Sequence, residues 1–314
     1  MTNQTKPELA TFVARDRCIA CGSEDFSVLG SGKFSEDPVR RFIDEDPWGE
    51  SPLPALGDHV WEYARCNQCG QSFQKWLLTP EWQEIRFRDW MSEEAIREFE
   101  REHALDQPEA RLSKGVELVR HALRLEKMTR ALRGGSALRV LDFGCGWGEF
   151  LVMSKLMGFE AYGIERAPDR QRSLLNQGVT AFPDLDVALQ TVGQGFHAAT
   201  LFQVLEHLEE PLKVLTAIRD VLVPGAVLVL EVPDCTGVTG IRSKTDYYQI
   251  HPLEHINCFT GESLRKLAER AGFKAETPAI AHVTTDPVKV LRGEAKRVVQ
   301  KMRTPGTNQY FRRV

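Results

Sequence analysis

Two pairs of cysteines have the spacing of a metal site. Each pair is a CxxC turn followed by a glycine, and such a turn brings two thiolates to one point. Together the turns supply four sulfur ligands for tetrahedral zinc, namely Cys18, Cys21, Cys66 and Cys69. Four ligands leave no open coordination position, so we expect this zinc to organise structure. Four unrelated buried or disulfide-bonded thiols are the alternative, and a cytosolic chain disfavours disulfides.

A glycine-rich turn is the second chemical feature. The run from Val140 to Phe150 has the pattern of a strand, a turn and a helix. The turn contains Gly144, Gly146 and Gly148, which would let a ligand approach the backbone in front of the helix N–H groups. A nicotinamide-binding GxGxxG motif would place its third glycine at position 149, which is Glu149. The spacing therefore indicates a different cofactor.

Two acids accompany this turn. Asp142 closes the strand before it, and Glu165 follows Gly148 by 17 residues. Glu165 also ends the apolar run 161–164, which places it at the end of a second strand. An acid at that position suits bidentate hydrogen bonding to a ribose diol.

The elements that would position these residues alternate along the second half of the chain. Four short apolar runs predict strands, at 137–143, 160–164, 198–204 and 226–232. Four amphipathic stretches predict helices, at 148–158, 168–177, 209–222 and 260–271. This alternation predicts a parallel α/β sheet.

The first half of the chain has a different pattern. A helical region is predicted over 80–133, with Pro80 at its first position and Gly134-Gly135 at its end. The segment 31–60 is rich in Pro, Gly and acids, so we expect a long loop whose acids, Asp46 among them, face solvent.

The glycine turn with its strand, helix and following acid resembles the cofactor loop of class I S-adenosylmethionine-dependent methyltransferases. The run 196–211 resembles that family's fourth strand with the following helix, and 222–233 resembles its helix-to-fifth-strand segment. The resemblance covers about residues 115–275. It implies a Rossmann-like α/β fold with a seven-stranded methyltransferase sheet, joined by a helical linker to a small N-terminal zinc-ribbon-like module.

The resemblance also implies residue roles. The methionine part of S-adenosylmethionine would be surrounded by Asp142, Gly144, Gly146 and Gly148. Glu165 would hold the ribose. Phe202 and Gln203 would lie beside the methionine portion, and Asp184 near the adenine.

Two histidine-containing segments could supply the proton acceptor that methylation of a hydroxyl or an enolised carbon needs. One contains His207, directly after the fourth predicted strand, and the other contains Glu254 and His255. Together with the double CxxC, they are similar to zinc-containing sugar C-methyltransferases, in which such groups are implicated in acid–base chemistry at a keto-sugar. The resemblance implies catalytic roles for His207, Glu254 and His255 and leaves the methylated atom, carbon or oxygen, open.

These observations predict four regions. Residues 1–78 form the zinc-binding module and 79–135 the helical linker. Residues 136–278 form the methyltransferase core, and 279–314 form a basic C-terminal extension with a helix over 287–303.

The distribution of charged residues along the chain indicates which class of methyl acceptor to expect. The 314 residues carry a net charge of −4, yet residues 287–314 hold eight basic residues and one acid. An acidic body favours a small-molecule acceptor over nucleic acid, and we expect a sugar or a glycosylated or nucleotide-linked metabolite. The basic tail keeps an RNA methyltransferase open as an alternative, and a non-catalytic binding protein on the same fold is a third. Neither a signal peptide nor a transmembrane segment is found in the sequence, so we expect a cytoplasmic protein.

Overall fold

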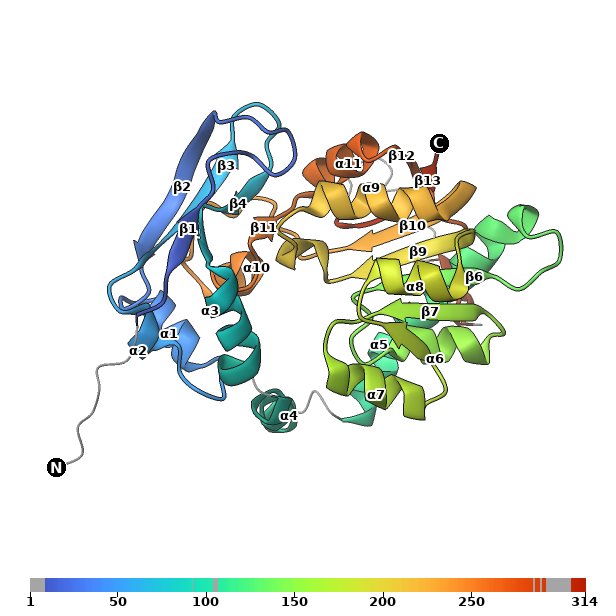
Figure 1. The fold of residues 1–314 in the computed structure, drawn as a ribbon, viewed down its shortest axis with the longest axis horizontal. Coiled ribbons are helices and arrows are strands. Elements are labelled where there is room, and N and C mark those ends of the chain that lie inside the picture. The colour runs from blue at the N-terminus through green and yellow to red at the C-terminus, as the bar shows by residue number, and fades with distance from the viewer. Residues whose placement is uncertain (1–8, 92, 104–106, 285, 289, 292–305) are drawn as a thin grey trace. The chain divides into compact units, whose positions relative to one another are not determined.

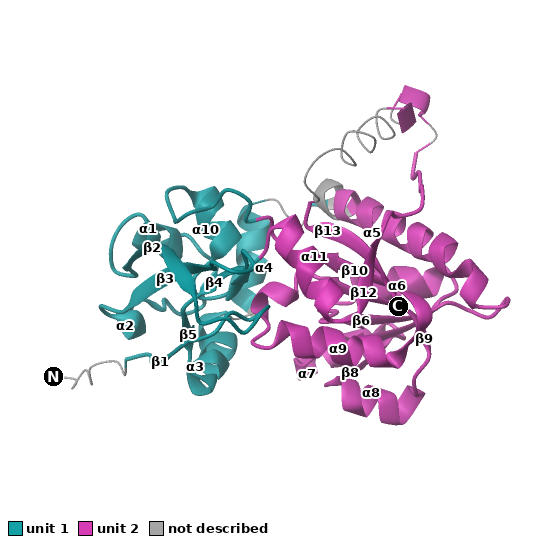
Figure 2. Cartoon of the chain, turned by 90° about the horizontal axis from the view of Figure 1, so that it is seen from above, with its two compact units in different colours: residues 1–111, 235–258 teal, residues 112–234, 259–314 magenta. Residues whose placement is uncertain are grey.

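The chain divides into two compact units. The computed structural model describes residues 9–91, 93–103, 107–284, 286–288, 290–291 and 306–314. Unit 1 comprises Met1–Arg111 and Cys235–Cys258, and unit 2 comprises Leu112–Asp234 and Phe259–Val314 (Figure 2). Each unit is therefore assembled from two separate stretches of the chain.

Within the described residues, unit 2 is built on a seven-stranded sheet of order β12-β13-β10-β9-β6-β7-β8 (Figure 1). The strands are β6 (Arg139–Phe143), β7 (Glu160–Ile164), β8 (Thr180–Phe182), β9 (Phe196–Phe202), β10 (Leu222–Glu231), β12 (Phe273–Glu276) and β13 (Asn308–Arg313). The strands from β10 to β8 are parallel, whereas β13 runs antiparallel to both of its neighbours. The predicted Rossmann-like seven-stranded sheet is confirmed, and the four strands predicted from apolar runs are parallel. The antiparallel strand β13 was not predicted.

Helices alternate with these strands. They are α6 (Glu149–Leu156), α7 (Pro168–Asn176), α8 (Leu185–Val192), α9 (Pro211–Val221) and α11 (Gly261–Arg270). The four predicted strands and four predicted helices are all confirmed. β8 was not predicted, because a three-residue strand is too short for a periodicity signal. The helix α8 that follows it was not predicted either.

The apolar residues of the central strands form the core of unit 2. Val140, Ala198, Val227 and Val229 are completely buried and share one cluster. Leu125 of the long helix α5 (Pro108–Thr129) belongs to the same cluster. Strands that are buried on both faces have continuous apolar sequences, so these strands could be predicted from the sequence.

Within the described residues, unit 1 contains a four-stranded sheet of order β11-β4-β3-β2 and a two-stranded sheet of β1 and β5. The strands are β1 (Phe12–Ala14), β2 (Phe26–Lys33), β3 (Val60–Cys66), β4 (Ser72–Gln74), β5 (Trp76–Leu78) and β11 (Asn257–Cys258). The helices are α1 (Val39–Asp44), α2 (Leu53–Leu56), α3 (Pro80–Ile85), α4 (Glu93–Glu102) and α10 (Lys244–Ile250), with a π-helical turn η1 (Arg86–Trp90).

Two predictions for the first half of the chain need correction. The segment 31–60 is not a long loop, because it contains the end of β2 and the helices α1 and α2. The helical region predicted over 80–133 begins at Pro80 as expected, but it is divided into α3, η1, α4, α5 and the short 3₁₀ helix η2 (Arg130–Leu132). Gly134 and Gly135 both have positive φ after η2, as expected for glycines that end a helical region.

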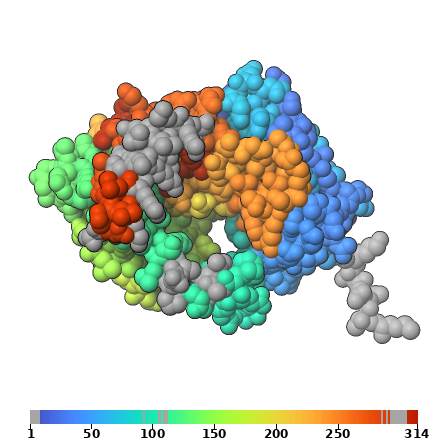
Figure 3. Space-filling model, turned by 180° about the vertical axis from the view of Figure 1, so that it is seen from behind, coloured from blue at the N-terminus to red at the C-terminus, as the bar shows by residue number. Residues whose placement is uncertain are grey.

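The segment 235–258 completes unit 1. Its strand β11 pairs with β4, and its residues Tyr247 and Ile250 are completely buried with Ile43 and Leu56 of the N-terminal stretch. Figure 3 shows the orange surface of this segment beside the blue surface of the N-terminal residues. Unit 1 therefore has one core made from both stretches.

The end of the chain contributes β13 to the sheet of unit 2, although we expected 279–314 to be an extension. Most of the predicted basic helix over 287–303 lies outside the described residues. None of the helices in the described part of the chain has the length and apolar character needed to cross a membrane.

A close backbone approach inside unit 1 gives a stability prediction. A Cβ at Gly30 would lie 2.9 Å from both Gly240 Cα and Thr239 O, and neither backbone atom can rotate away. We expect Gly30→Ala to lower the free energy of unfolding of unit 1 by about 1–3 kcal/mol. Urea unfolding followed by tryptophan fluorescence measures this, because five of the six tryptophans belong to unit 1.

Gly115→Ala is the matched control, since a Cβ there meets open space on helix α5. It should leave stability unchanged or raise it by up to about 1 kcal/mol. An unchanged unfolding midpoint in Gly30→Ala would contradict the close approach of β2 to the inserted segment.

Candidate functional site

The glycine turn of unit 2 joins β6 to α6 in a conformation that requires glycine. Gly144, Gly146 and Gly148 have φ values of 73°, 55° and 75°. A Cβ at Gly144 would lie 2.6 Å from Val204, and one at Gly148 would lie 2.0 Å from Leu174. A Cβ at Gly146 would meet no atom within 4 Å. The outer two glycines are thus explained by the side chains of Val204 and Leu174, which pack directly on the turn. The middle glycine leaves space that a ligand could occupy.

Glu165 holds this turn from the end of β7. Its Oε2 accepts the Gly146 N–H at 3.0 Å, and its Oε1 accepts the Ala167 N–H at 2.8 Å. The residue is 8% exposed, and the Arg170 guanidinium lies 3.8 Å from Oε2. Each carboxylate oxygen has a second lone pair, so both can accept a further donor such as a ribose hydroxyl.

Asp142 lies buried at the end of β6, beside the glycine turn. The Thr200 hydroxyl donates to Asp142 Oδ1 at 2.7 Å. Burial raises the pKa of Asp142 from 3.8 to about 7, and the Thr200 hydrogen bond opposes only part of this change. Asp142 is therefore protonated in a substantial fraction of molecules near neutral pH.

The ends of β9 and β10 carry the other predicted cofactor residues. The Phe202 ring packs edge-on against Phe150, with 5.2 Å between ring centroids. Gln203 has φ of 57°, and its N–H donates to the Glu231 carbonyl at 2.8 Å. Phe202 and Glu231 are register partners, so these side chains share the edge of the sheet at which the glycine turn begins. Asp184 caps helix α8 by accepting the Val187 N–H at 2.8 Å.

His207 belongs to the 3₁₀ helix η3 (Leu205–His207), directly after β9. Its Nε2 lies 3.8 Å from Oε1 of Glu206, which is 1% exposed. Burial raises the pKa of Glu206 to about 8. Neither Glu206 carboxyl oxygen has a hydrogen-bond partner among the described residues. Glu206 is thus a buried acid that prefers its protonated form near neutral pH.

Glu254 and His255 lie in unit 1, in the turn that follows α10. His255 Nδ1 lies 3.2 Å from the Gln249 carbonyl. A carbonyl can only accept, so Nδ1 carries the proton and Nε2 has the lone pair of the neutral ring. Glu254 Oε1 lies 3.9 Å from Nε2 of the neighbouring His251.

His251 is the centre of a buried ionisable cluster in unit 1. Its Nε2 lies 3.0 Å from both Asp46 Oδ2 and the Tyr247 hydroxyl, and that hydroxyl donates to Asp46. Burial alone would lower the pKa of His251, but the charges of Glu254 and Asp46 outweigh it and raise the pKa. The expectation that Asp46 faces solvent is wrong, because its side chain is 3% exposed and bonded within this cluster.

The four CxxC cysteines converge in unit 1. Their sulfur atoms all lie within 4.8 Å of one another, with 3.5 Å for the pairs Cys18–Cys69 and Cys21–Cys66. Tetrahedral zinc with bonds of about 2.3 Å would separate its sulfur ligands by about 3.8 Å. None of the four cysteines forms a disulfide. The cluster therefore has the donor set and the spacing to hold zinc.

Local backbone geometry creates this arrangement. The Gly22 N–H donates to the Cys18 carbonyl at 2.8 Å, and the Gly70 N–H donates to the Cys66 carbonyl at 3.0 Å. Both glycines have positive φ, 74° and 79°. Burial raises the pKa of the Cys66 thiol, but backbone N–H groups and neighbouring thiols outweigh it and lower the pKa to about 7. Burial instead raises the pKa values of the Cys18 and Cys69 thiols, so these two would lose their protons only to a bound cation.

Comparison with known proteins assigns the family. A sequence model described as a methyltransferase domain matches residues 87–277, which is more than half of the chain. The chain belongs to this methyltransferase-domain family. The glycine turn, Glu165 and the ends of β9 and β10 all lie within the matched residues of the methyltransferase domain.

Individual relatives are more distant. A ubiquinone biosynthesis O-methyltransferase of Xanthomonas campestris is 29% identical over 99 residues, covering 29% of this chain and 41% of that protein. One from Cereibacter sphaeroides is 31% identical over 98 residues, covering 29% and 40%. The chain thus spans about two fifths of the length of these relatives. A crystal structure of an S-adenosylmethionine-dependent methyltransferase from Archaeoglobus fulgidus is 21% identical, with coverage of 63% and 92% and a TM-score of 0.39.

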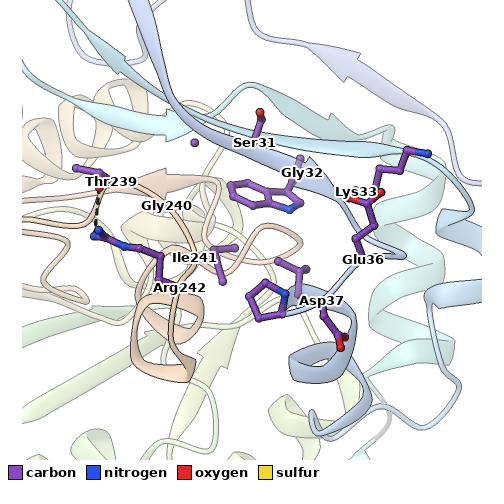
Figure 4. Close-up of a pocket in the computed structure, with 13 residues that line it drawn as sticks. Ser31, Gly32, Lys33, Glu36, Asp37, Thr239, Gly240, Ile241 and Arg242 are labelled. Carbon is purple, nitrogen blue, oxygen red and sulfur yellow. Dashed lines mark hydrogen bonds between the residues drawn. The ribbon is translucent and has the colours of Figure 1, made fainter.

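A cavity of about 320 Å³ in unit 1 was not predicted. It is lined by backbone of β2 and of residues 239–242, by the Trp61 indole and by charged side chains (Figure 4). Figure 4 shows Arg242, bonded to Thr239 at 3.2 Å, on the opposite side from Glu36 and Asp37. Trp61 is 6% exposed, and its Nε1 has no hydrogen-bond partner among the described residues.

Other residues at these sites were also missed by the sequence analysis. Glu231, at the end of β10, contacts His121 of the distant helix α5. Asp46 contacts His251, which is 205 positions later in the chain. Glu206 was visible in the sequence beside His207, but its burial was not. A single sequence contains no signal for such contacts, because periodicity reports only on residues close in the chain.

The buried Asp142 carboxyl of the methyltransferase domain predicts a pH effect. The pKa of Asp142 in the folded protein, about 7, exceeds the free value of 3.8. The contribution of this group to the free energy of unfolding is therefore fully present below about pH 4 and is lost as the pH rises through about 7. The loss amounts to about 4 kcal/mol. Asp142→Asn keeps the acceptor for Thr200 but cannot ionise, so we expect it to remove this loss and to stabilise the domain above pH 7.

Urea unfolding at a series of pH values, followed by circular dichroism, measures the effect. Asp186→Asn, at an exposed position in the first turn of α8, is the control and should retain the pH dependence of the wild type. A pH profile of Asp142→Asn that superimposes on the wild-type profile would show that this carboxyl is not the source.

Proposed function

We propose that the chain transfers a methyl group from S-adenosylmethionine to a small-molecule acceptor, with a histidine as general base. The observation that carries this proposal is the glycine turn held by Glu165 within the matched methyltransferase domain. Gly146 offers open space at the turn, and Glu165 retains lone pairs beside it. These residues fit the cofactor.

The cofactor roles follow from this fit. Asp142, Gly144, Gly146 and Gly148 would surround the methionine part of the cofactor, and Glu165 would accept the ribose hydroxyls. Phe202 and Gln203 would lie beside the methionine portion. The bound sulfonium supplies the methyl group as an electrophile. The contribution of the protein is to orient the acceptor and to remove its proton.

His255 has the features of a general base. The Gln249 carbonyl selects the ring tautomer whose Nε2 can accept a proton. Glu254, directly before His255 in the same turn, would stabilise the imidazolium through its negative charge. His207 is the second candidate, and its neighbour Glu206 favours the protonated, uncharged form near neutral pH.

Two observations bear on the acceptor. The curated relatives are named as O-methyltransferases, which supports an oxygen acceptor. The cavity of unit 1 offers an unpartnered indole N–H donor and carboxylate acceptors, and hydroxyl groups can satisfy both. This chemistry supports an acceptor with a hydroxylated ring, such as a sugar or a glycosylated or nucleotide-linked metabolite, methylated at oxygen or carbon.

We also propose that the four cysteines bind a structural zinc ion. Their sulfur separations and the turn glycines support tetrahedral coordination. The zinc would join the residues before β2 to the turn between β3 and β4, both in unit 1.

Calorimetric titration with S-adenosylmethionine and S-adenosylhomocysteine tests the function. We expect the wild type to bind both, and His255→Gln to bind them within about twofold of the wild type. Methyl transfer to a panel of nucleotide sugars and ring hydroxyl compounds should fall by about 10²- to 10⁴-fold in His255→Gln, because the proton acceptor is lost.

His59→Gln is the matched control, since His59 is another histidine of unit 1, with its ring tilted by 47° to that of Phe12 and 4.7 Å between ring centroids. Its transfer rate should equal that of the wild type. Loss of cofactor binding in His255→Gln, with unchanged turnover of the bound complex, would overturn the assignment of the base. A wild-type protein that binds neither compound would overturn the function.

Metal analysis of the purified protein tests the zinc proposal. We expect one zinc per chain in the wild type and a large loss in Cys66→Ser, with unfolding of unit 1, because metal binding and folding are coupled. Cys145→Ser, outside the cluster, should retain the metal. Full zinc content in Cys66→Ser would refute the proposed ligand set.

A further inference from the structure

Gln203 is held in an unusual conformation by Glu231. It is the one non-glycine residue with positive φ among the described residues. Its N–H donates to the Glu231 carbonyl at 2.8 Å, and its side-chain Nε2 lies 3.4 Å from Glu231 Oε1. A positive φ costs free energy for a non-glycine residue, so the conformation persists only where the surroundings hold it. Both the backbone and the side chain of Glu231 contribute to fixing Gln203.

Glu231 is itself oriented by a chain of hydrogen bonds. The Arg124 guanidinium, which can only donate, lies 3.4 Å from the Tyr310 hydroxyl oxygen. The Tyr310 hydroxyl is hydrogen-bonded to His121 Nδ1 at 2.5 Å. His121 Nε2 lies 3.5 Å from Glu231 Oε2 and 3.3 Å from Asn308 Nδ2. The Asn308 amide also donates to Oε2, at 2.5 Å. All of these residues belong to unit 2, and they come from α5, β10 and β13.

Glu231 contributes a negative charge to this edge of the sheet. Hydrogen bonding from His121 lowers the pKa of Glu231, and bonds from Gln203 and Asn308 add to this effect. Burial instead raises the pKa values of Asp142 and Glu206, to about 7 and about 8. At neutral pH Glu231 therefore has a full negative charge, whereas the other two carboxyl groups are partly or mostly neutral.

We propose that Glu231 is a positioning residue of the cofactor site, which holds Gln203 and makes the site prefer the cationic S-adenosylmethionine to the product S-adenosylhomocysteine. This inference rests on the proposed function. The two compounds differ by a methyl group and by the positive charge on sulfur, so a fixed anion distinguishes them through Coulomb attraction. Such a preference would favour exchange of product for fresh cofactor after each turnover.

Binding titrations of Glu231→Gln test the inference without any acceptor. Glutamine keeps the length and the acceptor oxygen of the side chain but has no charge. We expect the Kd of S-adenosylmethionine to rise by about tenfold and that of S-adenosylhomocysteine to change by less than about twofold. Glu231→Asp, which retains the charge, should preserve most of the wild-type preference.

Glu160→Gln is the matched control. Glu160 begins β7, at the opposite, amino-terminal edge of the parallel strands. Its substitution by glutamine therefore changes the net charge by the same amount at a position away from the site. It should leave both Kd values unchanged. If Glu231→Gln does not fold, Tyr310→Phe replaces it, because this variant removes only the hydroxyl that orients His121 and should weaken the preference in the same direction.

The outcomes separate this inference from the function on which it rests. Wild-type binding with an equal rise of both Kd values in Glu231→Gln would show a purely structural role and overturn the inference, while the proposed function stands. Unchanged values for both compounds would overturn it as well. A wild-type protein that binds neither compound would overturn the proposed function and this inference together.

Discussion

The candidate site of unit 2 depends on one carboxylate that accepts hydrogen bonds from two loops. Glu165 accepts the N–H of Gly146, from the turn after β6, and the N–H of Ala167, from the loop after β7. Because the two strands are adjacent and parallel, their carboxyl ends meet, and a single side chain can join both loops. The left-handed glycines and the edge of the sheet beside them are arranged around this contact.

The ionisable groups of unit 1 have a different origin. Asp46 comes from the N-terminal stretch, and Tyr247, His251 and Glu254 come from the inserted segment 235–258. Asp46, Tyr247 and His251 are hydrogen-bonded to one another in an interior that is mostly aromatic and aliphatic, and Glu254 lies 3.9 Å from His251. A buried polar cluster of this kind is costly when any member lacks its partners, so it specifies one arrangement of the two stretches.

The elements with strong local patterns could be predicted from the sequence. The glycine turn and Glu165 lie within 22 residues of one another, and the four apolar strands are continuous runs. The contacts that join distant segments could not be predicted. Glu231 meets Asn308 only because β13 returns antiparallel to β10, and it meets His121 of the distant helix α5. Asp46 was assigned to solvent because its neighbours in the sequence are acidic. Pairing of remote strands and burial of a charge are decided by the assembled fold, which leaves no periodic trace in the local sequence.

The discontinuous composition of unit 1 has a consequence for synthesis on the ribosome. The first stretch emerges early, but its sheet lacks β11 and its core lacks Tyr247 and Ile250 until residue 258 has been translated. By then most of the strands of unit 2 have already been made, since β6 to β10 precede the inserted segment. Vectorial synthesis usually lets an N-terminal domain fold first. In this chain the region that is made first must wait for later residues, so its exposed apolar surface would need protection during that interval.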